Sequence, residues 1–443
     1  MIKKKAIILG AGPSGLVTAW KLLENNWDVE VYEKLFIPGG MCRTWKWGNH
    51  YVDTGPHIFH TQDKFLENFW KKEFGDLLQE GEFWCKNVQG KNFEKLWDYP
   101  LSWESISEYP EEIRKKIMKE IKDLSPENSA RAKNFDEYIL SLVGETLFKM
   151  FFSKYPEKIW GIKGSEMTAE WAPKRIEIRQ KKLPFYHGQF SAVGKHGTGS
   201  IYERIKEKII ALGGKVFFGE TISQIETEDN LIKSIYTNSG KQIKLSKNDK
   251  CISTIPLTLT AKLLGHHTNL KFRGIKSVYL KYKEKNILPE KLHWLYFDSE
   301  KVFFNRVTET KKMSPQSSPS DETILTAEIT FSKGDKIDLM EAKELEKIIE
   351  RQLLGTGLTK DKFFLDSSVN TEYFVYPVQT KGFNEELSNA KGFVNQFNQL
   401  YSIGTGGEFN YADSQVLFHK AFDIVDVLCN TESKSNQVIK QIY

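Results

Sequence analysis

A strand, a glycine-rich turn and a helix at the start of the chain constrain its fold more than any other feature of the sequence. The apolar run Lys5–Leu9 predicts a buried parallel strand. The turn Gly10–Gly15 (GAGPSG) follows it directly, and apolar residues at helical spacing continue up to Asn25. Asp28–Glu33, in which valines alternate with acidic residues, predicts a second strand. Together these segments predict a complete βαβ unit.

Each glycine of the turn has a predicted task in binding a dinucleotide. Gly10 permits the tight turn, Gly12 lets the backbone approach a pyrophosphate, and Gly15 lets the helix pack closely on the strand. Free N–H groups at the helix N-terminus attract the phosphates. Glu33, about 20 residues further on, is expected to accept hydrogen bonds from ribose hydroxyls and to disfavour a 2′-phosphate. The cofactor is therefore expected to be FAD or NAD, and the alternative is a glycine turn that binds no nucleotide.

A second glycine pair distinguishes FAD from NAD. Gly39 and Gly40 follow Glu33 closely, and Arg43 stands beside them. Such a loop can lie against a second phosphate region, where Arg43 would make a charge-assisted contact. Many FAD proteins similar to glutathione reductase and to amine oxidases carry a glycine pair here, and this sequence resembles them. FAD is therefore the predicted cofactor, with an ordinary surface turn as the alternative.

Composition and charge argue against several classes of protein. The 443 residues include 63 Lys+Arg and 58 Asp+Glu, and no basic block is longer than Lys3–Lys5, so nucleic-acid binding is not expected. The four cysteines lie far apart without a CxxC pattern, which argues against disulfides and a zinc site and favours a cytoplasmic setting. The uncharged run Ala6–Trp20 is too short for a membrane span.

The rest of the chain predicts an α/β protein in which other segments interrupt the dinucleotide-binding fold. Charged helical patterns such as Glu111–Leu124 predict a helical insertion, and alternating aromatic patterns after residue 272 predict a mixed or antiparallel sheet. The expected parts are a discontinuous Rossmann-like FAD-binding domain (1–65, 196–265 and 390–443), a helical substrate-binding insertion (66–195) and a β-sheet substrate domain (266–389).

The segment Lys311–Asp321 differs in composition from its surroundings. It is polar, contains two prolines and lies between two predicted strands. Such a segment is expected to form a flexible hairpin loop, and no function is assigned to it.

Six blocks of sequence resemble UDP-galactopyranose mutase and occur in that enzyme's order. They are GPHIFHT (55–61), SKYPEKIWG (153–161), KRI (174–176), NRV (305–307), YPV (376–378) and NYAD (410–413). The resemblance implies an isomerase that interconverts the pyranose and furanose forms of a nucleotide sugar, with N5 of reduced FAD as the nucleophile at the anomeric carbon. It also implies a UDP-linked substrate and NAD(P)H or another reductant to activate the flavin, and it leaves a homo-oligomer open.

The resemblance gives roles to individual residues. Arg306 and Arg179 match arginines that bind the diphosphate, and His60 is expected to tune the flavin or to contact the sugar, so these three are the implied catalytic residues. The implied substrate-binding residues are Tyr155, Trp160, Arg175, Tyr376, Tyr411 and Asp413. The implied cofactor-binding residues are Gly10, Gly12, Gly15, Glu33, Gly39, Gly40, Arg43, His57, Val216 and Gly404.

Two departures from the bacterial mutases keep other functions open. The sequence Gly404–Gly407 (GTGG) replaces a Gly-Gly-Arg of those enzymes, and Ser253–Pro256 (STIP) is more similar to protoporphyrinogen oxidases and amine oxidases. The sugar and the base are therefore left open. The rival function is a FAD-dependent oxidoreductase of that second group, and a non-catalytic flavin protein is a third alternative. Spacing alone also allows structural histidines, solvated arginines and core aromatics at the matched positions.

Overall fold

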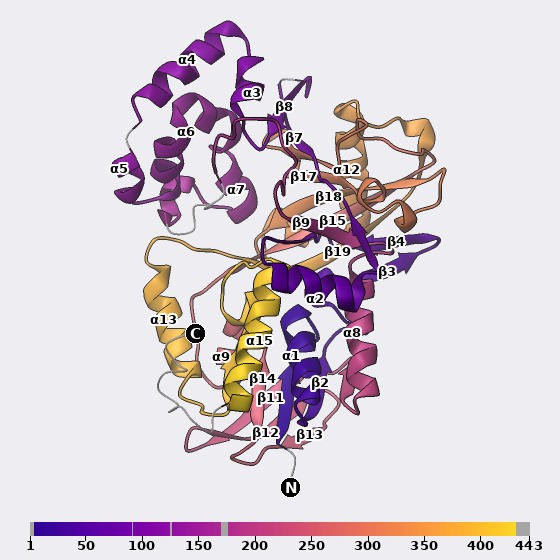
Figure 1. Ribbon diagram of the computed structural model, residues 1–443, viewed down its shortest axis with the longest axis vertical. Coiled ribbons are helices and arrows are strands. Elements are labelled where there is room, and N and C mark those ends of the chain that lie inside the picture. Colours follow the sequence, from indigo (N-terminus) through magenta and orange to yellow (C-terminus); the bar gives the residue numbers. More distant parts are fainter. Residues whose placement is uncertain (1–3, 91, 125, 170–175, 431–443) are drawn as a thin grey trace.

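A parallel five-stranded sheet carries the predicted βαβ unit. The fold is that of a computed structural model, which describes residues 4–90, 92–124, 126–169 and 176–430 (Figure 1). β1 (Lys5–Leu9) pairs in parallel with β2 (Asp28–Glu33) on one side and β14 (Lys250–Ser253) on the other. β10 (Lys215–Phe218) and β20 (Leu400–Ser402) complete the order β10-β2-β1-β14-β20. The predicted unit is confirmed, and the sheet joins segments from distant parts of the chain.

Both faces of this sheet are covered. Ala6 and Ile8 pack into a core shared with α1 (Pro13–Glu24), α8 (Gly199–Ala211) and α15 (Ser414–Asn430). Ile7 and Leu9 pack into a second core on the other face. That face is covered by the small sheet β11 (Ile222–Glu228), β12 (Leu231–Thr237) and β13 (Gln242–Lys244) and by helices α9 (Leu257–Leu263) and α13 (Phe383–Val394). Burial on two sides explains the continuous apolar sequence of β1.

A seven-stranded mixed sheet forms the second layer of the molecule. Neighbouring strands are antiparallel except β16 and β7, which are parallel. The order is β19 (Phe364–Pro377), β15 (Phe272–Tyr282), β18 (Thr323–Phe331), β17 (Arg306–Glu309), β16 (Trp294–Phe297), β7 (Cys85–Gln89) and β8 (Lys95–Tyr99). The predicted α/β fold with a mixed sheet is confirmed.

The insertion is not helical throughout. In Figure 1 most of its helices gather at the upper left, beside the mixed sheet, where they pack around one apolar cluster, whereas the first of them lies near the centre and packs into the core of the parallel sheet. β7 and β8 come from the same stretch of chain but belong to the mixed sheet, because their partner β16 lies far along the sequence. The helices are α2 (Lys64–Phe74), α3 (Trp103–Ser107), α4 (Glu111–Lys122), α5 (Pro126–Ala130), α6 (Phe135–Phe151) and α7 (Tyr155–Trp160). The division into three domains stays a prediction.

The remaining elements connect these layers. β5 (Phe59–Thr61), β9 (Phe190–Gly194) and β6 (Leu78–Glu80) form a three-stranded sheet, and β3 (Thr44–Trp47) pairs with β4 (His50–Asp53). The other helices are α10 (Thr310–Met313), α11 (Lys336–Leu339), α12 (Ala342–Gly355) and α14 (Gly404–Gly407). Within the described residues, no helix has both the length and the apolar character needed to span a membrane.

The segment Lys311–Asp321 connects the antiparallel strands β17 and β18, so the predicted hairpin is confirmed, but the expected flexibility is wrong. The segment begins in α10 and packs against the protein, with Met313 and Ser317 buried. The buried Lys311 Nζ donates hydrogen bonds to the carbonyls of Pro319, Ser320 and Glu322 at 2.5, 2.8 and 2.7 Å. One ammonium group therefore satisfies three backbone carbonyls, which in a flexible loop would form hydrogen bonds with water.

Candidate active site

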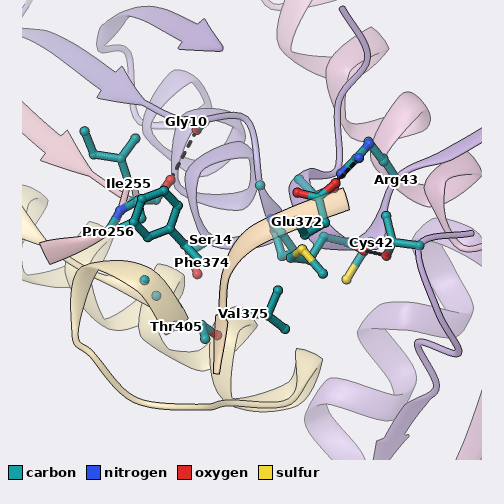
Figure 2. A pocket seen from close by; sticks show the side chains of 18 of the residues that line it. Gly10, Ser14, Cys42, Arg43, Ile255, Pro256, Glu372, Phe374, Val375 and Thr405 are labelled. Atoms are coloured by element: carbon teal, nitrogen blue, oxygen red, sulfur yellow. Dashed lines mark hydrogen bonds and ion pairs between the residues drawn. The ribbon is translucent and has the colours of Figure 1, made fainter. Parts of the chain in front are cut away.

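A cavity of about 730 Å³ opens at the carboxyl ends of the parallel strands. Gly10 follows β1, Glu33 ends β2, Thr254 follows β14 and Gly404 follows β20, and all four line the cavity. Ligands of open α/β sheets bind at this edge. Figure 2 shows that residues of β19 enclose the cavity from the opposite side. The cavity thus lies between the two sheets.

The glycine turn has the geometry that its sequence predicts. Gly10 has φ of 103°, which side chains rarely allow, and its N–H donates to the Tyr32 carbonyl at 2.8 Å. A Cβ on Gly15 would lie 2.2 Å from the Gly10 oxygen, so the helix and the strand are in close contact. A Cβ on Gly12 would meet nothing within 4 Å. That open space lies at the start of α1, where a phosphate would be placed.

The second glycine pair packs directly against the first turn. The Gly39 N–H donates to the Ala11 carbonyl at 2.8 Å, and a Cβ on Gly40 would lie 3.0 Å from the Gly12 Cα. Ser14 is buried in α1 and lines the cavity, and its hydroxyl has no hydrogen-bond partner within the described part of the chain. Buried hydroxyls are almost always satisfied. Ser14 therefore fits a site whose missing partner is a phosphate oxygen.

Glu33 and Arg43 already have protein partners. The Glu33 carboxylate accepts hydrogen bonds from the N–H groups of Ala11 at 2.7 Å and Leu35 at 2.9 Å, which fixes it at the cavity wall. Arg43 forms an ion pair with Glu372 of β19 and donates to Asn370 Oδ1 at 3.1 Å (Figure 2). The charge that we expected Arg43 to offer to a phosphate is thus largely paired with Glu372. Arg43 lines the cavity and joins the two sheets.

Near β10, the residues that line the cavity differ from the predicted contact, Val216. Val216 of β10 pairs with Val31 and is not among the cavity-lining residues. The segment 220–224, which follows β10, lines the cavity instead. The sequence carries no motif for this segment, whose position depends on the turn between β10 and β11.

The two predicted histidines have different surroundings. His57 lines the cavity, and its Nδ1 lies 2.8 Å from the Gly55 carbonyl, to which it must donate. Burial lowers the pKa of His57 to about 4, so the ring is neutral near pH 7, with Nε2 as an acceptor. His60 is buried on β5, stacks on Tyr186 with ring centroids 4.1 Å apart, and lies 3.3 Å from Asp413 Oδ2. His60 therefore lies beside Asp413 but is not itself among the cavity-lining residues.

Arg306 brings a cation to the cavity. Its guanidinium binds the buried Glu328 carboxylate through both Nε and Nη2, with the second contact at 2.7 Å. Burial by itself lowers the pKa of Arg306, but Glu328 more than offsets this effect, and the pKa lies well above its usual value. Nη1 makes no hydrogen bond within the described residues, so one edge of the fork is available to a ligand.

Arg179 is near this region but does not line the cavity. Its Nη1 and Nη2 donate to the carbonyls of Pro184 at 2.9 Å and Phe185 at 3.2 Å. Burial raises the pKa of the Cys85 thiol, and the charges of Arg306 and Arg179 both lower it in part. Arg175 lies outside the described residues.

The predicted aromatic residues form a wall beside Arg306. Tyr376 and Tyr411 line the cavity and stack with centroids 5.5 Å apart. Trp160 packs on Tyr376 at 6.4 Å and on Tyr155 at 5.4 Å. Tyr155 and Trp160 belong to α7 and lie behind the lining residues. Burial raises the pKa of both Tyr376 and Tyr411, so both hydroxyls keep their protons and can donate hydrogen bonds.

The sequence did not predict the acidic partners of the two arginines. Glu328 on the fully buried strand β18 binds Arg306, and Glu372 on the partly exposed strand β19 binds Arg43. Cys42 also lines the cavity, and burial raises the pKa of its thiol to about 12, so it is not a nucleophile at neutral pH. Within the described residues, no group of three or more His, Cys, Asp or Glu is placed to hold a metal ion.

Comparisons with known proteins agree with this geometry. Residues 13–371 match the protein family described as flavin containing amine oxidoreductase. dTDP-fucopyranose mutase from Escherichia coli is 29% identical over 212 residues, which are 45% of this chain and 53% of that protein. A probable UDP-galactopyranose mutase from Klebsiella pneumoniae is 24% identical over 219 residues, 47% of this chain and 54% of that protein. The chain therefore spans about half the length of these two relatives.

A solved structure supports the fold over nearly the whole chain. Reduced UDP-galactopyranose mutase superimposes with a TM-score of 0.83 and 20% identity, covering 98% of this chain and 95% of that one. The resemblance to pyranose mutases that the sequence blocks indicated is confirmed. The glycine turn, Ser14 and Glu33 line a cavity whose geometry suits a dinucleotide. The family match covers most of the chain, and so the protein belongs to the flavin containing amine oxidoreductase family and its cofactor is FAD.

Proposed function

We propose that the protein interconverts the pyranose and furanose forms of a nucleoside-diphosphate sugar. When bound and reduced, FAD would supply the nucleophile, N5, at the anomeric carbon. The observation that carries the proposal is the position of Arg306, whose guanidinium lines the same cavity as the glycine turn and keeps one edge available. A diphosphate leaving group needs a cation at this place, because negative charge grows on it as the glycosidic bond breaks.

Residues around Arg306 suit a diphosphate and a sugar. The protonated hydroxyls of Tyr376 and Tyr411 can donate to phosphate oxygens beside the guanidinium. Neutral His57 offers Nε2 as an acceptor for a sugar hydroxyl. Asp413, next to His60, can accept from another hydroxyl. These groups suit an anionic, hydroxyl-rich ligand, whereas a simple aliphatic amine offers no anion to Arg306.

Arg179 would have to move to join this site. Its guanidinium donates to Pro184 and Phe185, and only exchange of those hydrogen bonds would bring it to the diphosphate. Arg179 thus fits a residue that changes partners when ligand binds. His60 acts in this proposal by holding Asp413, and not by touching the ligand itself.

The rival function is oxidation of an amine or of a ring carbon, which the family name itself allows. Amine oxidases often hold a lysine near the flavin ring. Here the lining lysines within the described residues are Lys34, next to Glu33, and Lys262 of α9, a helix that contacts β11. Both lie toward the 220–224 end, whereas the cation beside Tyr376 and Tyr411 is an arginine. This placement favours the mutase.

The decisive experiment is turnover under controlled reduction. Enzyme reduced with dithionite should convert a furanose nucleotide sugar into its pyranose isomer, with UDP- and dTDP-linked sugars tested side by side by chromatography. Oxidised enzyme should be nearly inert, and neither oxygen nor NAD(P)H should be consumed in proportion to substrate. Arg306→Lys should lose activity, while Arg204→Lys, at a surface ion pair with Asp76, should retain it. Stoichiometric oxygen consumption with an amine would support the rival instead.

The remaining parts of the proposal concern the setting of the enzyme. A reductant such as NAD(P)H would keep the flavin reduced between turnovers. A cytoplasmic location and a role in polysaccharide synthesis would suit a nucleotide-sugar substrate, and a homo-oligomer is left open.

A further inference from the structure

Five consecutive residues of β19, Glu372 to Tyr376, all line the cavity. In a regular strand successive side chains point to opposite faces, so at most three of the five could face one side. The segment therefore departs from regular strand geometry where it passes the cavity. This departure needs a cause in the pairing of β19.

The cause is a bulge opposite Gly274 of β15. Arg273 pairs with Tyr376 and Ile275 pairs with Glu372, so Gly274 alone faces the three residues Tyr373–Val375. A Cβ on Gly274 would lie 2.5 Å from the Glu372 oxygen and 2.3 Å from the Phe331 ring. Glycine is thus the residue that lets the bulge approach β15. Bulges of this kind re-aim side chains and are common beside active sites.

The bulge is held at both ends. At its start, Glu372 is paired with Arg43, which follows the second glycine pair. At its end, Tyr376 stacks on Tyr411 with centroids 5.5 Å apart. Arg43 belongs to the segment that packs on the FAD turn, and Tyr411 follows α14. The bulge therefore spans the cavity from the glycine turns to the aromatic residues beside Arg306, and contacts at both ends fix its position.

Phe374 is the residue that the bulge presents. Its ring packs edge-on against Phe272 at 5.7 Å, and Phe272 packs against the buried Phe409 at 4.9 Å. The other side of Phe374 is uncovered, and the residue is 37% exposed although it lines the cavity. In Figure 2 its ring lies toward Gly10, Ile255 and Pro256, and Glu372 lies toward Arg43 and Cys42. An aromatic ring that is packed on one side and exposed on the other is preorganised to stack against or contact a ligand.

We propose that Phe374 packs against bound FAD and slows its release, and that the bulge at Tyr373–Val375 exists to bring this ring over the cofactor. Gly10, Gly12 and Ser14 hold the dinucleotide from the first sheet, and Phe374 closes on it from the second sheet. The proposal depends on the cofactor and not on the reaction, so it is independent of the mutase function.

The test measures FAD release from purified holoprotein. After dilution, the rise in free-flavin fluorescence should be about 10- to 30-fold faster in Phe374→Ala than in wild type, because the apolar contact of one ring is lost. Phe374→Leu should fall between the two. The rise in Tm that added FAD gives to the apoprotein should shrink in the same order, while the Tm of the apoprotein itself changes little, since the ring is partly exposed without ligand.

Leu365→Ala is the matched control. Leu365 lies on the same strand, is 46% exposed and is not among the cavity-lining residues. It should release FAD at the wild-type rate. Wild-type release from Phe374→Ala, or equally fast release from Leu365→Ala, overturns the proposal. If Phe374→Ala does not fold, the same comparison is made with Phe374→Leu, which keeps the packing on Phe272.

Discussion

The ion pair between Arg306 and Glu328 should make the loss of Arg306 harmful to folding as well as to ligand binding. Glu328 has a side chain that is 3% exposed, and its two oxygens accept hydrogen bonds from Nε and Nη2 of Arg306. In Arg306→Ala this carboxylate stays buried without its cation. Breaking one side of a buried pair typically costs about 3 to 5 kcal/mol, against a total stability of about 5 to 15 kcal/mol.

A second substitution separates the two effects. In Arg306→Ala with Glu328→Gln, no charge is buried, and the remaining cost is that of an unsatisfied amide, about 1 to 3 kcal/mol. The double variant should therefore regain about 2 kcal/mol of stability over Arg306→Ala, from the difference of these two costs. It should not regain affinity for a nucleoside diphosphate, because the guanidinium contact, about 1.5 to 3 kcal/mol, stays absent.

Urea unfolding of the three proteins, followed by tryptophan fluorescence, measures the first effect, and titration of UDP or dTDP by calorimetry measures the second. The reasoning is refuted if Arg306→Ala is as stable as wild type, or if the double variant is no more stable than the single one. Recovered nucleotide affinity in the double variant would show that the diphosphate does not bind at Arg306.

Three further outcomes follow from the structure. Gly12→Val should abolish FAD retention, because the valine side chain fills the open space beside α1. Flavin absorbance after gel filtration measures the retention, and a normal FAD content would contradict the assignment. Burial lowers the pKa of His57 in the folded protein to about 4, whereas the ordinary value is 6.5. The unfolded chain therefore binds a proton at this residue more readily, and the free energy of unfolding falls as the pH drops from about 6.5 toward 4. His57→Gln apoprotein should therefore lose less stability than wild type between pH 7 and 5 in urea unfolding, and an identical pH dependence would argue against a neutral buried ring. Lys311→Met should expose the segment after α10 to limited proteolysis, because three carbonyls lose their donor. Unchanged cleavage in Lys311→Met would show that other contacts hold the segment.

Local sequence patterns predicted the parts of the site that depend on the backbone alone. Gly10, Gly12 and Gly15 behave as expected, since a positive φ, an open approach and a close helix contact each require glycine at that position. The edge of the sheet where the cavity lies also follows from the strand-turn-helix order. These features are encoded within the first forty residues, and so a single sequence is enough to find them.

Pairings between distant residues could not be predicted in the same way. Arg43 is bound to Glu372 across the two sheets, and Arg306 to Glu328 across neighbouring strands, so neither cation is as free as its motif suggested. The sequence predicted a helical insertion where β7 and β8 are found, because the strand that pairs with β7, β16, lies far along the chain. Gly274 within a predicted strand is a sign of a bulge, but the sequence alone does not tell which residues of β19 lie opposite it, because that depends on the pairing of distant strands.

The strand order of the five-stranded sheet has a consequence for biosynthesis. The nucleotide-binding turn is synthesised long before β14 and β20, and Gly404 and Asp413, which line the cavity, follow β20 in the sequence. Until then β1 has one unpaired edge and apolar side chains that have no core. The cavity is therefore complete only after β20 and the residues up to Asp413 have been synthesised, and FAD, by binding the folded state alone, shifts the folding equilibrium toward it.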